Sequence, residues 1–272
     1  MKNFFSLKIS LVSIVSLFTL SYVALISLIY FYQESLLFLP EKLTSDYQFN
    51  LKDVHEVRIE VTGATLSALY YRRPNPDGLV FFLHGNAGSL KNWLTDTSFY
   101  EKVNYDLFML DYRGYGKSTG SIESEEQFYD DIHRAWKYAI NSREYKSTII
   151  YGRSLGTAPA AYLSGIESCD LTVLVSPYYN MSKMAELYYP WVPKALLRYP
   201  FDTAKHLKSI KNPVLIFHGT NDKLIPPEHS KLLEEENHNV KLILVENAQH
   251  DDMHLFDTYI DHLNKILTEL AG

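Results

Sequence analysis

The sequence has little cysteine: Cys169 is the one thiol among 272 residues. A single thiol forms no internal disulfide and supplies no zinc site built from several cysteines. The chain also lacks a positive excess, because 26 Lys and Arg stand against 32 Asp and Glu, for a net charge of −6. Binding of nucleic-acid phosphates needs a clustered positive surface, so no nucleic-acid partner is expected.

Beyond residue 33 there is no Gly/Ser-rich linker, internal repeat or low-complexity stretch. Hydrophobic residues make up 46% of the chain and charged residues 21%, a composition that supports a full core and is unlike that of a disordered acidic tail. About 240 residues remain after residue 33, which fits one α/β domain. We therefore expect a single domain over residues 34–272.

A long uncharged run occupies residues 9–33. As a helix it would extend about 36 Å, enough to cross a hydrocarbon layer of roughly 30 Å. The alternative is a cleaved signal peptide, but its apolar region is normally shorter and ends in a small-x-small cleavage site, which does not follow here. Tyr22, Tyr30 and Tyr32 add aromatic rings typical of a membrane interface. Residues 1–33 are therefore expected to be a retained single-pass anchor, with the lipid bilayer as a partner.

The charges that flank this run predict its orientation. Lys2 and Lys8 precede it, whereas Glu34, Glu41 and Lys42 follow it closely. Positive residues favour the cytoplasmic side, so we expect a cytoplasmic N-terminus and an extracytoplasmic domain.

Short apolar runs separated by helix-length segments predict the fold. Residues 54–61 and 66–71 flank Thr62-Gly63 and indicate a hairpin. The later runs are continuous, as is typical of strands buried on both faces of a parallel sheet. Ser124-x-x-Gln127 indicates the start of an amphipathic helix between them. The sequence thus predicts a mostly parallel, twisted α/β sheet covered by helices, with further strands at residues 79–83, 107–110, 148–151, 171–175, 214–217 and 240–245.

The segment GRSLG, residues 152–156, follows one of these strands. It has the form G-x-S-x-G between a predicted strand and a predicted helix, which is the context of a nucleophile elbow. Side chains at Gly152 and Gly156 would collide in so tight a turn. Their absence would let Ser154 project its hydroxyl as the nucleophile, at a helix N-terminus that favours developing negative charge.

A serine hydroxyl needs an imidazole to accept its proton and a carboxylate to orient that imidazole. Asp222 follows the strand at residues 214–217, and His250 follows the last strand. The order Ser154, Asp222, His250 is the one expected of hydrolases on this architecture. Asp251 and Asp252 are alternatives for the acid, although their position favours capping of a following helix.

An acyl-transfer site also needs N–H donors for an oxyanion. HGNAG, residues 84–88, follows the strand at 79–83, where such hydrolases supply one donor. The predicted oxyanion hole consists of the main-chain N–H groups of Asn86 and Leu155. His84 and His218 both stand at strand ends and are interpreted as hydrogen-bonding groups rather than as the base.

Two other chemistries match the sequence less well. Gly116-Lys117-Ser118 resembles the tail of a phosphate-binding loop, but that motif would require glycine at Asp111. His250 and His254 are spaced as metal ligands on a helix, yet no third ligand is evident. We expect neither a cofactor nor a metal ion.

Together HGNAG, DYRGYGKS, GRSLG, HGTND and QHDD resemble the α/β-hydrolase superfamily. With the anchor and the adjoining ESLLFLP, the chain is similar to the bud-emergence subgroup of membrane-anchored serine hydrolases. The resemblance implies an eight-stranded α/β-hydrolase sheet and a triad of Ser154, Asp222 and His250. It also implies that Asp111 and Arg113 are structural.

Residues 176–201, which we call the cap segment, interrupt the alternation of strands and helices with a dense aromatic and aliphatic stretch. One interpretation is that the segment only covers the sheet. The other is a cap over Ser154 that contacts an acyl chain, with Tyr178 and Trp191 binding substrate.

The sequence as a whole predicts a serine hydrolase that cleaves ester or thioester bonds of small-molecule, lipid-like or acylated substrates through an acyl-enzyme intermediate. A peptidase or aminopeptidase on the same triad remains open. A non-catalytic scaffold that retains the fold is the alternative from another class.

Overall fold

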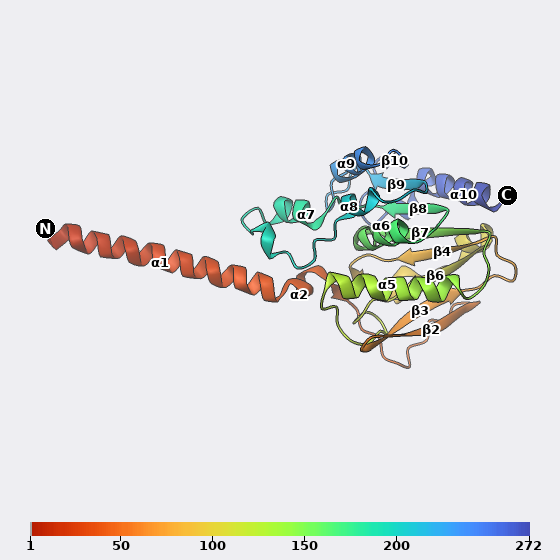
Figure 1. Cartoon of the computed structure of the whole chain (residues 1–272), viewed down its shortest axis with the longest axis horizontal. Helices are drawn as coiled ribbons and strands as arrows, with labels where there is room; N and C mark the ends of the chain where they lie inside the picture. The colour runs from red at the N-terminus through yellow and green to blue at the C-terminus, as the bar shows by residue number, and fades with distance from the viewer. Residues whose placement is uncertain (1) are drawn as a thin grey trace.

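The computed structural model describes residues 2–272, with side chains from residue 11 onward. Its centre is an eight-stranded sheet in the order β10-β9-β8-β7-β4-β6-β3-β2 (Figure 1). Every predicted apolar run lies in one of these strands, and antiparallel pairing joins β2 to β3 and β3 to β6, while the other neighbours are parallel. The predicted mostly parallel sheet is confirmed. The strands are β2 Val54–Val61, β3 Ala64–Tyr71, β4 Gly78–Leu83, β6 Tyr105–Leu110, β7 Ser147–Arg153, β8 Leu171–Val175, β9 Val214–Gly219 and β10 Val240–Val245.

Helices cover both faces of the sheet and enclose two apolar cores. On one face, Trp136 and Leu163 pack with the side chains of β4 and β6. On the other, Leu263 and Leu267 pack with alternate residues of the same strands. Continuous apolar strands follow from this two-sided burial. The helices are α3 Leu90–Trp93, α4 Ser98–Lys102, α5 Glu125–Ile140, α6 Thr157–Ile166, α7 Met181–Tyr188, α8 Thr203–Leu207, α9 Glu228–Glu236 and α10 Asp257–Ala271, with 3-10 turns η1 Ser154–Gly156, η2 Lys194–Leu196 and η3 Met253–Leu255.

The N-terminal helix α1, Lys2–Phe31, projects away from the sheet, on the side opposite the C-terminus (Figure 1). Its stretch Leu11–Phe31 is long and apolar enough to cross a membrane, and none of those side chains is buried. By length and composition this helix fits a membrane span or a signal sequence.

A short second sheet ties the chain after α1 to the domain. Following α2, Gln33–Leu37, the strand β1, Leu39–Pro40, pairs in parallel with β5, Ala87–Gly88. Phe38 lies in the core against Tyr199 and Phe201. The carboxyl edge of the large sheet, where β4 ends and β5 begins, therefore faces the base of α1.

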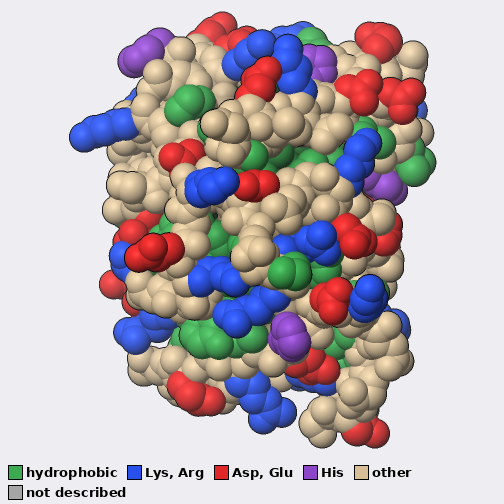
Figure 2. Space-filling view, turned by 90° about the vertical axis from the view of Figure 1, so that its right-hand side faces the viewer, with side chains coloured by type: hydrophobic (Ala, Val, Ile, Leu, Met, Phe, Trp, Pro, Cys, Tyr) green, Lys and Arg blue, Asp and Glu red, His purple; other side chains and the backbone are tan. Residues whose placement is uncertain are grey.

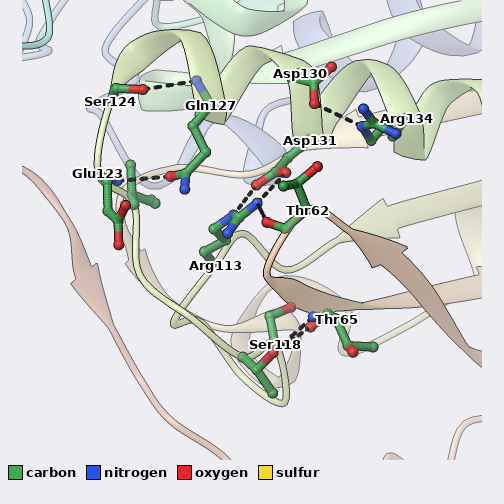
Figure 3. Close-up of polar contacts among 12 residues, drawn as sticks. Thr62, Thr65, Arg113, Ser118, Glu123, Ser124, Gln127, Asp130, Asp131 and Arg134 are labelled. Carbon is green, nitrogen blue, oxygen red and sulfur yellow. Dashed lines mark hydrogen bonds and ion pairs between the residues drawn. The ribbon is translucent and has the colours of Figure 1, made fainter.

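Arg113 and Asp131 form a buried ion pair behind that edge (Figure 3). The guanidinium donates through Nε to Oδ2 at 2.5 Å and through Nη2 to Oδ1 at 2.9 Å. A second bond from Nη2, at 2.8 Å, reaches the carbonyl of Thr62 in the β2–β3 turn. These contacts give Arg113 the structural place that the family resemblance implied. The same view shows Ser124 accepting from the N–H of Gln127, so the predicted start of α5 is confirmed.

Replacing Asp131 with alanine is expected to lower the free energy of unfolding by about 3 to 5 kcal/mol, because the Arg113 charge would stay buried without its partner. Urea unfolding followed by circular dichroism measures the loss. The control is Arg134→Ala on the same helix, whose ion pair with Asp130 is half exposed. That change should cost about 0.5 kcal/mol or less. Equal losses for the two variants would contradict a structural role for Arg113.

Candidate active site

The nucleophile elbow is built at the junction of β7 and α6. Ser154 has φ +51°, a left-handed conformation that is rare for a residue with a side chain. A Cβ atom at Gly152 would lie 2.3 Å from the carbonyl oxygen of Gly156, and one at Gly156 would lie 2.1 Å from that of Leu83. Both glycines are therefore required by space, as the sequence predicts. The turn holds Ser154 above the start of α6, with 8% of its surface exposed.

The three predicted catalytic side chains come together at the carboxyl edge of the sheet. The Oγ atom of Ser154 lies 2.9 Å from Nε2 of His250. Nδ1 of His250 lies 2.7 Å from Oδ2 of Asp222. Since a carboxylate only accepts hydrogen bonds, Nδ1 carries the proton and Nε2 is free to accept from the serine hydroxyl. Asp222 and Ser154 precede His250 by 28 and 96 residues in sequence, and the three side chains form one chain of hydrogen bonds.

Asp222 is held by more than His250. Its Oδ1 atom accepts the N–H groups of Leu224 at 3.0 Å and Ile225 at 2.8 Å. The buried His218 places Nε2 3.3 Å from Oδ2. Burial alone would raise the pKa of Asp222, but the hydrogen bonds from His218, His250 and Ile225 outweigh it and lower that pKa well below its usual range. The carboxylate is therefore ionised whenever the protein is folded at ordinary pH.

The lowered pKa of Asp222 predicts a pH-dependent contribution to stability. Because the folded state prefers the ionised form, the contribution is fully present above about pH 4, the ordinary aspartate pKa in an unfolded chain, and is lost as the pH falls through the lower folded-state pKa. The difference in unfolding free energy between wild type and Asp222→Asn should therefore narrow below about pH 4. Urea titrations from acid to neutral pH measure it, and a difference that widens in acid would contradict the assignment.

His218 is a neighbour of Asp222 whose role was not predicted from the sequence. The sequence predicts a strand-end hydrogen-bonding group at this position, and His218 does bond Ser230 Oγ through Nδ1 at 2.5 Å and the carbonyl oxygen of Ile225 through Nε2 at 2.7 Å. Its proximity to Asp222 makes it a positioning residue for the acid loop. The spacing His218-x-x-x-Asp222 in HGTND was the available signal.

The predicted oxyanion donors lie beside the nucleophile. A Cβ at Gly85 would lie 3.5 Å from Cβ of Ser154, which places the HGNAG loop against the elbow. Within residues 2–272, no hydrogen bond is donated by the main-chain N–H of Asn86 or Leu155. The carbonyl of Asn86 accepts from the Tyr115 hydroxyl at 2.7 Å and from the N–H of Leu39 at 2.9 Å, which fixes the peptide after Asn86. The peptide that contains the N–H of Asn86 is held through the carbonyl oxygen of Gly85, 2.7 Å from Nδ1 of His84. Both N–H groups are available for an oxyanion.

Arg153 braces the histidine loop from the residue before the nucleophile. Its Nη2 donates to the carbonyl oxygen of His250 at 3.1 Å, and its guanidinium lies 5.3 Å from the centre of the Trp93 ring. Trp93 in turn donates from Nε1 to the carbonyl of Ala87 at 2.9 Å. One arginine thereby links the histidine loop to the HGNAG loop.

The two predicted substrate contacts take different places. Tyr178 is 1% exposed and donates its hydroxyl to the carbonyl oxygen of Leu155 at 3.2 Å. It therefore lies in the core beneath Leu155, the predicted oxyanion donor, and its contact with substrate stays a prediction. Trp191 is 44% exposed, and its carbonyl oxygen accepts from the Tyr22 hydroxyl of α1 at 3.0 Å. Its contact with substrate stays a prediction.

The capping role expected of Asp252 needs correction. Asp252 does not cap the following turn with its side chain; Oδ1 accepts the N–H of Gln249 at 2.6 Å and braces the histidine loop. His229 of α9 is also buried, and its Nδ1 accepts the N–H of Tyr179 at 2.9 Å.

The rival chemistries find no support in these contacts. Both ring nitrogens of His250 are engaged by Ser154 and Asp222, which leaves neither for a metal ion. Asp111 is buried and accepts the N–H of Leu90 at 3.0 Å, inside the turn where a phosphate-binding loop would need open N–H groups.

Comparisons with known proteins agree with this architecture. A family profile described as serine aminopeptidase, S33, matches residues 74–200, which include the elbow and end before Asp222. The alpha/beta hydrolase domain-containing protein 17B of Xenopus tropicalis is 32% identical over 86% of this chain and 82% of its own length. The human 17B protein is 31% identical over the same shares.

Solved structures show the same fold. An esterase of Pyrococcus furiosus superposes with a TM-score of 0.70 at 20% identity, covering 87% of this chain and 98% of that one. Est1E of Butyrivibrio proteoclasticus, solved with ferulic acid, gives a TM-score of 0.61 at 17% identity over 78% and 96% of the two chains. Sheet order, elbow and the relatives of similar length lead to one assignment: the chain belongs to the α/β-hydrolase superfamily.

Proposed function

We propose that the protein is a membrane-anchored serine hydrolase that cleaves ester or thioester bonds of lipid-like or acylated substrates. The observation that carries the proposal is the chain of hydrogen bonds from Ser154 through His250 to Asp222, at 2.9 and 2.7 Å. An aligned nucleophile, base and orienting carboxylate are what acyl transfer requires.

In the proposed reaction, Ser154 Oγ attacks the carbonyl carbon while His250 Nε2 takes the hydroxyl proton. Asp222 holds the imidazole in the required tautomer and stabilises the imidazolium that forms. The N–H groups of Asn86 and Leu155 receive the oxyanion. His250 then returns its proton to the departing alcohol or thiol. A water molecule, deprotonated by the same imidazole, hydrolyses the acyl-enzyme and releases the acid.

The anchor supports the choice of substrate class. If α1 spans a bilayer, the carboxyl edge of the sheet faces the membrane surface, because β1 pairs with β5 close to the base of that helix. Lys2 and Lys8 before the helix favour a cytoplasmic N-terminus, so the proposed site of the domain is extracytoplasmic. The names of the solved neighbours, which include esterases, support an ester bond.

Labelling of membranes with a fluorophosphonate probe tests the nucleophile. The mapped peptide should carry the probe on Ser154, and labelling should disappear in Ser154→Ala. A folded protein that stays unlabelled would favour the scaffold alternative.

An aminopeptidase is the second candidate, because the matching family profile bears that description. The triad itself does not choose between oxygen, sulfur and nitrogen leaving groups. A panel of acyl esters, acyl thioesters and aminoacyl amides of matched size separates the two. Turnover of the amides alone would replace the esterase proposal with the peptidase.

A further inference from the structure

The cap segment is fastened to the base of the N-terminal helix. Nε2 of Gln33 donates to the carbonyl of Leu196 at 2.8 Å, and Oε1 of Gln33 accepts the N–H of Arg198 at 2.8 Å. The Arg198 side chain forms an ion pair with Glu34 at 2.5 Å. The hydroxyl of Tyr199 also donates to Glu34, at 2.8 Å. Residues 196–199 are thereby fixed where α1 passes into α2.

From this clamp the cap segment runs back along α1, toward the N-terminus of the helix (Figure 1). The contact between Tyr22 and Trp191 lies 11 residues before Gln33, which is about 16 Å along a helix axis. If α1 spans a bilayer, its uncharged part begins at Ile9. The piece from Ile9 to Tyr22 is only about 20 Å long, less than the roughly 30 Å of hydrocarbon. The height of Tyr22, and Trp191 with it, therefore falls inside the bilayer.

The part of the cap segment at this height has the composition of a membrane-inserted loop. Residues 187–193, which we call the cap tip, read LYYPWVP and carry no charge. Leu187, Tyr188, Tyr189 and Trp191 are each between 43% and 50% exposed. An ion pair between Glu186 and Lys194 closes the base of the tip. Aromatic side chains of this kind favour the boundary between headgroups and acyl chains.

We propose that the cap tip inserts into the bilayer beside α1 and seats the domain on the membrane. This inference rests on the proposal that α1 is a retained anchor. The occupant of the exposed aromatic surface is the lipid of the same membrane, because the tip continues the apolar surface of α1 and its charged residues begin only at the Glu186–Lys194 ion pair.

The opposite face of the molecule has a different character. Figure 2 shows the face turned away from α1, where Lys and Arg side chains are interspersed with Asp and Glu and the hydrophobic patches between them are small. Charged side chains of both signs are suited to water. The asymmetry gives the domain one orientation on the membrane.

The seated tip also contacts the catalytic loops. The hydroxyl of Tyr188 donates to the carbonyls of Lys223 at 3.1 Å and Leu224 at 2.7 Å, directly after Asp222. The active site therefore lies next to the inserted segment. An acyl chain would reach Ser154 from the bilayer without crossing water.

Depth-dependent fluorescence quenching tests the insertion in the full chain. An environment-sensitive dye is attached to Trp191→Cys in a Cys169→Ser background, and the protein is placed in phosphatidylcholine nanodiscs that contain lipids spin-labelled on the acyl chain. Matched labels at Leu17→Cys on α1 and at Glu269→Cys on α10 give the membrane and water references. Quenching at 191 should exceed that at 269 by a factor of about three or more.

The label at position 191 decides the proposal in every case. Quenching there no stronger than at 269 would overturn it, whether or not position 17 is quenched. Absence of quenching at 17 would in addition remove the anchor on which it rests. None of these readings depends on catalysis, so a protein without hydrolase activity still returns an answer.

A charge variant gives the functional readout. Leu187→Glu with Tyr189→Glu should lower hydrolysis of a long-chain ester embedded in vesicles by about tenfold, because each carboxylate resists burial in lipid. Hydrolysis of a short-chain, water-soluble ester should be unchanged. The control adds the same charge on the far side, as His262→Glu with Thr268→Glu, both at exposed positions of α10. Equal losses on both esters would contradict a role in membrane seating, whereas failure of wild type on both would count against the hydrolase proposal alone.

Discussion

Ser154→Ala is expected to lower kcat by about 10⁶-fold toward any substrate that the protein turns over, because members of such a triad act as a unit. The residual rate would come from the N–H groups of Asn86 and Leu155 and from substrate binding. Alanine keeps a Cβ atom at φ +51°, so the backbone strain of the elbow is unchanged and the variant should unfold at the same temperature as wild type.

The measurement is kcat together with thermal unfolding in the same detergent or nanodisc preparation. Ser121→Ala, at an exposed serine outside the site, is the matched control and should leave both quantities unchanged. A fully active Ser154→Ala protein would exclude the elbow as the source of the nucleophile.

Asp222→Asn is expected to lower kcat by about 10⁴-fold while leaving substrate binding nearly intact. The amide removes the charge that stabilises the imidazolium, and it no longer enforces a proton on Nδ1 of His250. The loss should be smaller than for Ser154→Ala because the nucleophile and the base remain. Kinetics over a range of substrate concentrations separate kcat from KM.

Asp252→Asn is the discriminating control for this prediction. Asp252 is only two residues from His250, but its carboxylate accepts the N–H of Gln249 and supports the loop. Its replacement should cost less than about tenfold in kcat. A larger loss for Asp252→Asn than for Asp222→Asn would move the acid role to the adjacent residue.

The sheet and the chain of hydrogen bonds from Ser154 to Asp222 were predictable from the sequence, because local sequence patterns mark the strands and the loops that carry these residues. The run at residues 107–110, LFML, is apolar throughout, and a strand covered on both faces allows little else. The GRSLG motif requires both of its glycines, since a Cβ atom at either one would collide with a main-chain oxygen. Once parallel strands are placed, the loops that carry Asp222 and His250 must meet the elbow at one edge.

Other features were beyond prediction because they depend on contacts between distant, unpatterned segments. Nothing periodic marks the pairing of Leu39 with Ala87, which joins two-residue strands. Tyr178 stands in an aromatic stretch whose sequence does not reveal which rings turn inward. The meeting of Tyr22 with Trp191 spans 169 residues and depends on the direction in which α1 leaves the domain.

The β1–β5 pairing has a consequence for any cut made between helix and domain. The N–H of Glu41 donates to the carbonyl oxygen of Gly88 at 2.8 Å, just as that of Leu39 donates to Asn86, so β1 steadies the loop that carries the predicted oxyanion donor. Proteolysis in the exposed stretch around residues 44–48 would separate β1, together with α1, from the rest of the domain. A domain released by that cut would lose the β1–β5 pairing, and its HGNAG loop would be less well ordered. A domain released by a cut before Gln33 would keep the pairing and the order of that loop.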